Sequence, residues 1–213
     1  MLVQLLRGKS LQRSLMNLEA RRRVSLEGVV LDLGSGHQPS YWEYLVREKP
    51  HRVVKIDRHP YVDIWASLED PLPFRDEAVD RVLCFNVLEH LFDYTRLVQE
   101  VHRVLRNGGI AYVYVPFLIN VHSDPQDYFR YTEEALRRIL GADGRFSNVT
   151  VRPLGAGAFT AAANLLCYAP RVGPWLQILW AFPALWADGI LQRLQGEEYC
   201  RRWPLGYFVE AVK

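Results

Sequence analysis

The chain has few cysteines, few lysines and no uninterrupted apolar run long enough to cross a bilayer. Its 213 residues include 3 cysteines, Cys84, Cys167 and Cys200, without a C-x-x-C pair. This pattern disfavours a disulfide framework and a cysteine-based zinc site, so we expect a cytoplasmic protein without a bound metal. The net charge of +2 is too small by itself to indicate nucleic-acid binding.

The first 27 residues lack the long apolar stretch and small-residue cleavage site of a signal peptide. We expect residues 1–27 to form a separate helical element, which either packs over the core or lies as a basic helix on a membrane surface. Its leucines recur at roughly helical spacing, with basic side chains between them: Leu2, Leu5, Leu6, Leu11, Leu15 and Leu18, with Arg7, Lys9, Arg13 and Arg21 to Arg23.

Residues 29–36 form a short apolar run that leads directly into a glycine turn. The run is typical of a strand buried on both faces. Gly34 and Gly36 let the backbone turn sharply and let a ligand approach it closely. Such a turn offers backbone N–H groups to anions, especially where a helix follows. We expect that helix over residues 40–48.

A third glycine is missing from this loop, and its absence separates two cofactor classes. A dinucleotide fingerprint requires G-x-G-x-x-G, but Pro39 stands at the third position. Asp32 also places a carboxylate at the end of the strand, which is unfavourable beside a pyrophosphate and favourable beside a sulfonium. The combination favours S-adenosylmethionine, although an ordinary strand-to-loop turn also fits these residues.

Further strands follow at regular intervals. A second strand over residues 51–56 ends in Asp57, 21 residues after Gly36, where a carboxylate can accept hydrogen bonds from ribose hydroxyls. Residues 79–85 and 110–115 are predicted strands, and residues 101–109 are predicted to be the end of a helix stopped by Gly108 and Gly109. Strands are also expected over residues 145–152 and 205–212.

This series resembles the class I S-adenosylmethionine-dependent methyltransferases, in particular the small-molecule group. The resemblance rests on the glycine loop, Asp57, Leu72-Pro73-Phe74, the stretch ending in Leu88-Glu89-His90-Leu91, and Arg103-Val104-Leu105 before the paired glycines. It implies a three-layer α/β sandwich with a Rossmann-like, seven-stranded, mostly parallel sheet, an antiparallel last strand and a helical insertion before that strand. The methyltransferase domain would cover residues 28–213.

The same resemblance implies which residues contact S-adenosylmethionine. Ser67 stands where relatives often carry an acidic residue near the adenine, so contact there would come from Ser67 or Leu68. His37, beside the glycine loop, could face the methionyl end. The full set of implied cofactor contacts is Asp32, Gly34, Ser35, Gly36, Asp57, Arg58, Ser67, Leu68 and Asn86.

The loop after the fifth strand is rich in ionisable and aromatic side chains, and it lies at the strands' carboxyl ends, where open parallel sheets bind ligands. We assign His122 as a general base and Asp124, Tyr128 and Arg130 to the acceptor. The alternative is that Tyr128, Arg130 and Tyr131 only fasten the loop to the sheet. His90 is assigned to architecture or to packing on the cofactor side, and Thr132 is predicted to cap the next helix.

Charge is almost absent from residues 153–187, where Arg171 is the only charged residue. The prolines predict a bent helical hairpin, not a membrane span, within an insertion over residues 154–203. Three interpretations remain open: a cover over the substrate, which we favour, a homodimer interface, or a patch on the inner face of the membrane. The residues concerned are Trp175, Trp180 and Trp186, with Pro170, Pro174, Pro183 and Asp188 as interruptions.

These observations predict an S-adenosylmethionine-dependent methyltransferase that O-methylates a small-molecule, sugar or lipid-linked acceptor. The loop pattern from His122 to Thr132 is similar to one in methyltransferases that accompany bacterial glycan biosynthesis. The alternatives are a catalytically silent methyltransferase-like binding module and a nicotinamide-dependent oxidoreductase.

Overall fold

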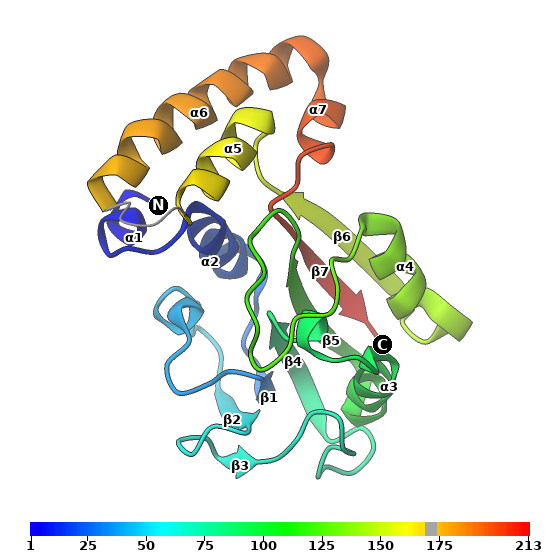
Figure 1. Cartoon of the computed structure of the whole chain (residues 1–213). Helices are drawn as coiled ribbons and strands as arrows, with labels where there is room; N and C mark the ends of the chain where they lie inside the picture. The colour runs from blue at the N-terminus through cyan, green and yellow to red at the C-terminus, as the bar shows by residue number, and fades with distance from the viewer. Residues whose placement is uncertain (169–173) are drawn as a thin grey trace.

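A seven-stranded sheet forms the centre of the protein in the computed structural model, which describes residues 1–168 and 174–213 (Figure 1). The strand order is β3-β2-β1-β4-β5-β7-β6, and β7 runs antiparallel to both of its neighbours while the other pairs are parallel. This arrangement confirms the predicted fold. The strands are β1 (Gly28–Leu33), β2 (His51–Asp57), β3 (Ile64–Trp65), β4 (Val79–Phe85), β5 (Leu105–Pro116), β6 (Asn148–Leu154) and β7 (Gly206–Val212).

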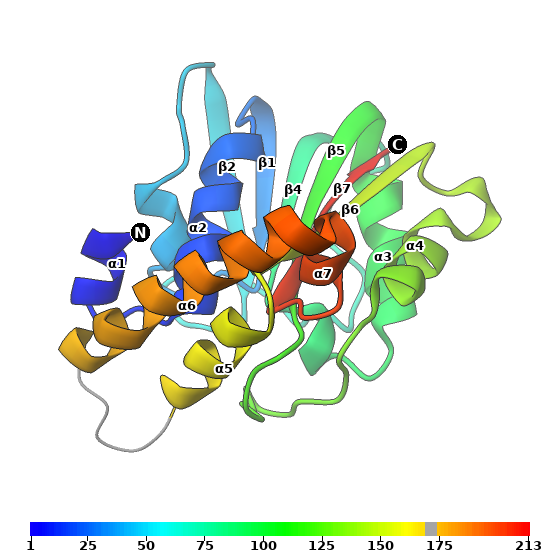
Figure 2. The same ribbon diagram turned by 90° about the horizontal axis from the view of Figure 1, so that it is seen from above.

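Helices cover both faces of the sheet, as a three-layer sandwich requires (Figure 2). Side chains alternate between the two faces of a strand, so each face has its own apolar core. α3 (Tyr94–Val104) and α4 (Glu133–Gly141) bury Leu97 and Leu136 on one face. On the other face, α2 (Leu11–Arg23) buries Met16 and Ala20 against Leu83 and Tyr112.

The N-terminal element is part of this second layer. α1 (Leu2–Leu6) and α2 form it. The α2 side chain of Gln12 donates from Nε2 to the hydroxyl of Tyr114 at 2.7 Å, and the following Ser25 N–H donates to Tyr112 at 3.2 Å. These contacts join the first 27 residues to the middle of the sheet.

The prediction of a helix over residues 40–48 is wrong. A 3-10 turn occupies only Ser40–Glu43, and no helix continues through residue 48. The chain is held there by two adjacent side chains that reach the same buried carboxylate: the Tyr41 hydroxyl and the Trp42 Nε1 donate to Asp32 at 2.5 and 2.6 Å. A tight turn lets neighbouring residues converge on one group in this way.

The paired glycines also have a different role from the predicted helix stop. α3 ends at Val104, and β5 already begins at Leu105, so Gly108 and Gly109 lie inside a strand. The register of β5 against β4 shifts between Val79 and Arg81, which marks a bulge. A Cβ on Gly109 would lie 2.8 Å from the Arg106 carbonyl oxygen, so this close approach requires glycine.

One later boundary is displaced. The strand expected over residues 145–152 is β6, which begins only at Asn148 because a 3-10 turn over Ala142–Gly144 precedes it. The insertion contains α5 (Ala158–Leu166), α6 (Pro174–Gln195) and α7 (Glu197–Arg201). Pro170 and Arg171 lie outside the described residues.

α6 is a single helix of 22 residues that continues through Pro183, so the prediction that this proline breaks the helical segment is wrong. An interior proline removes one backbone hydrogen bond, and the flanking Ala181 and Ala184 are both buried in the packed face of the helix. Asp188 is buried and accepts bonds from the Thr160 N–H and the Tyr199 hydroxyl at 2.6 and 2.7 Å. One carboxylate therefore connects α5, α6 and α7.

Among the described residues, no helix combines the length and the apolar composition needed to cross a membrane. The hairpin of α5 and α6 lies on the same side of the molecule as α1 and α2 (Figures 1 and 2). The inner side chains of this hairpin form a third apolar cluster with the N-terminal element, made of Leu5, Leu11, Ala161, Ala181 and Leu205.

Candidate active site

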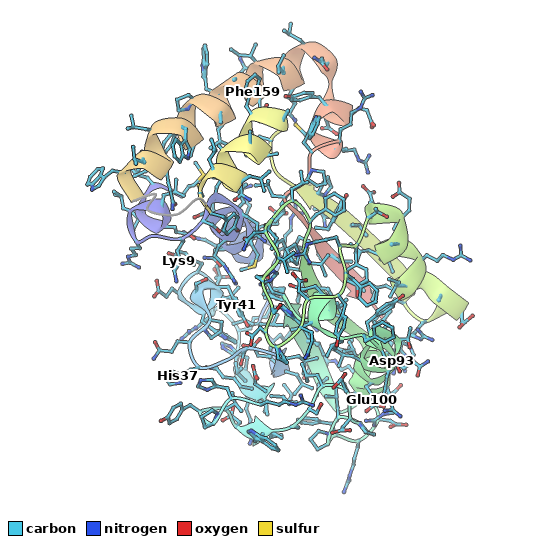
Figure 3. The ribbon with its side chains drawn as sticks, viewed as in Figure 1. Lys9, His37, Tyr41, Asp93, Glu100 and Phe159 are labelled. Carbon is cyan, nitrogen blue, oxygen red and sulfur yellow. The ribbon has the colours of Figure 1, made fainter. Side chains whose placement is uncertain are left out.

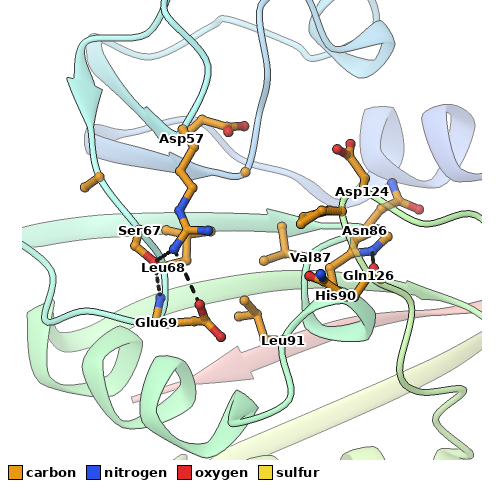
Figure 4. A pocket seen from close by; sticks show the side chains of 14 residues that line it. Asp57, Ser67, Leu68, Glu69, Asn86, Val87, His90, Leu91, Asp124 and Gln126 are labelled. Carbon is orange, nitrogen blue, oxygen red and sulfur yellow. Dashed lines mark hydrogen bonds and ion pairs between the residues drawn. The ribbon is translucent and has the colours of Figure 1, made fainter.

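A cleft opens at the carboxyl ends of β1, β2 and β4, where a doubly wound sheet binds its ligands (Figure 4). Asp57 and Ser67 stand on one side of it, and His90, Asp124 and Gln126 on the other. The residues that line the cleft are Gly34, Asp57, Arg58, Ala66, Ser67, Leu68, Glu69, Asn86, Val87, His90, Leu91, Asp124, Pro125 and Gln126.

Gly34 lines the cleft, and Gly36 belongs to the same loop. Both have positive φ, +63° and +59°, which L side chains rarely adopt. A Cβ on Gly34 would lie 2.5 Å from the Val87 Cγ2 atom. Only a residue without a side chain therefore fits at this position between the ends of β1 and β4. Ser35, between them, is buried, and its hydroxyl donates to the Gly36 carbonyl at 3.2 Å.

Asp57 holds the glycine loop against β2. Its two carboxylate oxygens accept the Gly36 N–H at 2.7 Å and the His59 N–H at 3.2 Å. The carboxylate is thus fixed in orientation at the edge of the cleft. Backbone donors fill part of its hydrogen-bonding capacity, and each oxygen retains a further lone pair for a ligand hydroxyl.

Arg58, Ser67 and Glu69 form a polar rim next to Asp57. The Arg58 guanidinium donates to the Ser67 hydroxyl at 2.6 Å and lies 3.5 Å from the Glu69 carboxylate (Figure 4). Leu68, Val87 and Leu91 provide apolar wall between these groups and the opposite side. The rim and the wall together offer a slot for a flat ring with polar edges.

Asp32 lies beneath the cleft and does not line it. Its side chain is fully buried, and both carboxylate oxygens are occupied by Tyr41 and Trp42. Burial raises the pKa of Asp32 to about 7, against the opposing effect of those two hydrogen bonds. The structure thus places Asp32 where it supports the turn after the glycine loop.

Asn86 follows β4 with a backbone φ of +55°, a conformation that asparagine tolerates better than most residues. Its N–H donates to the Tyr114 carbonyl at 2.9 Å, and its side-chain amide lies 3.7 Å from the Met16 sulfur. The N-terminal element therefore contacts a residue of the cleft.

The loop between β5 and α4, residues 117–132, is called the acceptor loop here. An ion pair between Asp127 and Arg130 braces it. The guanidinium donates to both Asp127 oxygens, at 2.5 and 2.6 Å, and these hydrogen bonds lower the pKa of Asp127 to about 2. Asp127 also accepts the His122 N–H at 2.9 Å. Tyr131 fastens the next part of the chain by donating to the Leu88 carbonyl at 2.9 Å.

His122, His90 and Glu89 lie together beside the cleft. The rings of His90 and His122 are 5.0 Å apart, edge to face, and the Nε2 atom of each is 3.8 Å from Oε1 of Glu89. Glu89 is fully buried, which raises its pKa to about 8, while partial burial lowers the pKa of His122. Sequence reasoning gave Glu89 no role and assigned His90 to architecture or to packing on the cofactor side, so it did not predict this cluster.

Most of the residues assigned to the cofactor line the cleft. Of the residues assigned to the acceptor, only Asp124 does. Gly34, Asp57, Arg58, Ser67, Leu68, Asn86 and Asp124 line the cleft, whereas Asp32, Ser35, Gly36, His37, His122, Tyr128 and Arg130 are not part of its lining. His37 instead stacks on His59, with ring centroids 5.8 Å apart. Tyr128 packs edge-on against Phe92 at 5.5 Å.

Sequence reasoning did not assign seven lining residues: Ala66, Glu69, Val87, His90, Leu91, Pro125 and Gln126. A signal existed for several of them. Pro125 and Gln126 lie within the loop that was singled out, and Glu69 follows Ser67 by two residues, close to the acidic position that relatives carry.

Comparison with known proteins adds to this geometry. Residues 31–113 match the family model described as a methyltransferase domain. A probable S-adenosylmethionine-dependent methyltransferase of Mycolicibacterium smegmatis is 37% identical over 98 residues, 41% of this chain and 37% of that protein. A Mycobacterium tuberculosis protein of the same description is 34% identical over 98 residues, 41% of this chain and 35% of that protein. Residues 31–113 are therefore similar in sequence to methyltransferase domains, and both curated relatives are described as S-adenosylmethionine-dependent.

Solved structures share the fold of this chain. An S-adenosylmethionine-dependent methyltransferase of Archaeoglobus fulgidus has a TM-score of 0.59 and 17% identity, covering 99% of this chain and 97% of that one. Phosphoethanolamine N-methyltransferase 2 of Haemonchus contortus, solved with S-adenosyl-L-methionine, has a TM-score of 0.57 and 16% identity, covering 93% and 52%. At these identities the likeness extends to the fold alone. The matches to the curated relatives span 37% and 35% of those relatives' length.

Proposed function

We propose that the whole chain is an S-adenosylmethionine-dependent O-methyltransferase. The observation that carries this proposal is the cleft in which the glycine loop and the Asp57 carboxylate meet at the ends of β1 and β2. When bound, S-adenosylmethionine supplies a methyl group that is already activated by its sulfonium, so the protein needs mainly to align the acceptor and exclude water.

The cleft residues fit this cofactor. Asp57 is fixed by backbone donors with lone pairs toward the cleft, as ribose hydroxyls require. Leu68 and Val87 supply an apolar wall for the adenine, and Ser67 and Glu69 supply polar groups at its edge. A side chain at Gly34 would fill this space, which supports the assignment of the loop to the cofactor.

On the acceptor side, Asp124 and Gln126 project from the loop into the cleft opposite Asp57. We assign His122 as the residue that takes the proton of the acceptor hydroxyl through Nε2, and Asp127 and Arg130 as the groups that hold the loop in place. Tyr128, partly exposed beside Phe92, would contact a larger part of the acceptor.

The acceptor that we propose is lipid-linked, with a sugar hydroxyl as the methylated group. One face of α6 carries large apolar side chains that remain exposed at helical spacing: Trp175, Leu179, Phe182 and Trp186. Figure 3 shows side chains projecting outward from this helix, on the side away from the sheet. Exposed apolar patches of this kind mark interaction surfaces, and tryptophan is enriched at membrane interfaces. The α5 side chain of Asn164 donates to the Leu118 carbonyl at 3.1 Å, which connects this hairpin to the acceptor loop.

The experiment that tests the cofactor assignment is Asp57→Ala. Two charge-assisted hydrogen bonds to ribose, at roughly 1.5–3 kcal/mol each, correspond to a loss of about 100-fold or more in affinity for S-adenosylhomocysteine. Isothermal titration measures it, with Asp143→Ala, an exposed carboxylate on the 3-10 turn before β6, as the matched control.

Undiminished affinity in the Asp57→Ala variant would contradict the ribose assignment. Binding of NAD by the unmodified chain, at an affinity equal to that for S-adenosylhomocysteine, would contradict the proposed cofactor. Binding of S-adenosylhomocysteine without methyl transfer to any sugar or lipid-linked acceptor would instead favour a catalytically silent module.

A further inference from the structure

We propose that Glu89, His90 and His122 bind a divalent transition-metal ion at the wall of the cleft. Each residue offers one ligand atom, and the three atoms lie within 4.8 Å of one another. They come from two separate segments, the turn after β4 and the acceptor loop. This inference goes beyond the proposed function and replaces the sequence-based expectation of no bound metal.

The first argument is the state of Glu89. The residue is 0% exposed, and neither carboxylate oxygen has a hydrogen-bond partner. Its separations of 3.8 Å from the Nε2 atoms of His90 and His122 are too long for hydrogen bonds. A buried carboxylate without partners is costly and rare in native proteins. A cation between Glu89 and the two imidazoles would satisfy it.

The second argument is the orientation of the two imidazoles. His90 Nδ1 lies 2.6 Å from the Gln126 carbonyl oxygen, which only accepts, so this nitrogen carries the proton and Nε2 presents a lone pair. His122 Nδ1 lies 3.4 Å from the Asp127 carboxylate without forming a hydrogen bond to it, and the negative charge of that carboxylate favours the same tautomer. Metal-binding histidines are typically oriented by a carbonyl or carboxylate on the other ring nitrogen.

The ligand set indicates which ion binds. Two imidazole nitrogens and one carboxylate oxygen suit Zn²⁺ and neighbouring transition metals, whereas Mg²⁺ and Ca²⁺ prefer oxygen ligands. Bonds of 2.0–2.1 Å to zinc would require the Nε2–Oε1 separations to shorten by about 0.5 Å. Three protein ligands leave at least one position open, as in catalytic zinc sites.

The site adjoins the proposed acceptor position. His90 lines the cleft, and so does Gln126, whose carbonyl orients it. A bound ion could therefore hold an acceptor hydroxyl and lower its pKa, a role that rests on the proposed function. His122 cannot coordinate the ion and accept a proton at the same Nε2 atom, so with the ion bound His122 is a ligand and no longer the base.

The test uses the full chain after treatment with EDTA, titrated with Co²⁺ and followed by visible absorption. We expect one Co²⁺ per chain, competed by Zn²⁺ and not by equimolar Mg²⁺. Glu89→Gln keeps the shape of the side chain and should weaken binding at least 10-fold. His122→Ala, a change in the partly exposed loop, should do the same.

His37→Ala is the matched control, because His37 and His59 stack on each other and could bind the probe adventitiously. That variant should bind Co²⁺ as the unmodified chain does. Absence of stoichiometric binding, or equal binding in Glu89→Gln and His122→Ala, would overturn the metal site. If Glu89→Gln does not fold, His122→Ala decides the result.

A parallel titration with S-adenosylhomocysteine separates this inference from the proposed function. Co²⁺ binding without S-adenosylhomocysteine binding would support the metal site and contradict the proposed cofactor. S-adenosylhomocysteine binding without Co²⁺ binding would overturn the metal site and return His122 to the role of general base.

Discussion

Two buried carboxyl groups, Asp32 and Glu89, have opposite surroundings. Asp32 receives hydrogen bonds from Tyr41 and Trp42, whereas Glu89 has none and faces two imidazole nitrogens. The first group is therefore satisfied by the protein itself, and the second is arranged for an added cation or proton. Burial alone does not distinguish these two cases; the donors and acceptors around each group do.

The raised pKa of Asp32 predicts how stability changes with pH. The folded protein holds this proton up to about pH 7, and the unfolded chain releases it near 3.8, so the free energy of unfolding falls as pH rises between those values. The pKa difference sets an upper bound of about 4 kcal/mol. Lys55 and Asp57 are the charged neighbours, with opposing effects.

In the Asp32→Asn variant, the side chain at this position no longer takes up or releases a proton in this pH range. Urea denaturation from pH 4 to 7.5 should show the variant most destabilised relative to the unmodified protein at low pH, with the difference shrinking as pH rises. A difference between the two proteins that is constant across this range would contradict the assignment.

Single residues also show what a sequence can and cannot predict about the site. Gly34, Asp57 and Asn86 were predictable because each follows a strand whose end is fixed by its apolar pattern. The burial of Asp32 was not, because Tyr41 and Trp42 read as part of a helix and only the folded turn aims both at one carboxylate. Glu89 was missed because one of its two neighbours, His122, lies 33 residues away on another loop.

At the scale of elements, α6 is apolar on two faces. One face packs against α5 and buries Ala181, Ala184 and Asp188. The opposite face leaves Trp175, Leu179 and Trp186 exposed, at 74%, 67% and 72%. The sequence showed the lack of charge, but only the packing identifies which of these side chains are left without a partner within the described residues.

We expect this exposed face to bind vesicles that contain anionic lipid. Replacement of Trp175, Leu179 and Trp186 by serine should release the protein in a flotation assay, because it removes the largest exposed apolar groups. Tyr61→Ser, at an aromatic residue that is 69% exposed outside the insertion, is the control and should keep binding. Affinity for S-adenosylhomocysteine should be unchanged in both variants.

Equal flotation of the triple variant and the unmodified protein would contradict a lipid-facing α6. A doubled molecular mass that returns to the monomer value in the triple variant, without vesicle binding, would identify the face as a homodimer interface instead.

At the scale of the whole molecule, the N-terminal element belongs to the folded domain. α2 covers one face of the sheet, and Gln12, Met16 and Ser25 contact side chains of β5 and the residue after β4. The family match begins only at residue 31, so this layer lies outside the matched region. The general sheet topology was predictable from the series of motifs, but which helices cover it was not, because helix spacing alone does not say what a helix packs on.

Deletion of residues 1–23 should therefore weaken the whole fold. The change exposes Leu83, Tyr112 and Tyr114, which α2 covers. We expect a lower urea midpoint and increased binding of a hydrophobic dye at neutral pH, both compared with the full chain. An unchanged midpoint with intact affinity for S-adenosylhomocysteine would show that the element is an appendage.

Asp188 gives the insertion a fixed register. Apolar contacts are not directional, so they fix the position of α6 along α5 less strictly than hydrogen bonds do. A buried carboxylate that must meet the Thr160 N–H and the Tyr199 hydroxyl permits only one position. Asp188 thereby holds the exposed face of α6 at one position relative to α5 and α7. If α6 docks on a lipid surface as we propose, this carboxylate sets the height of the cleft above that surface.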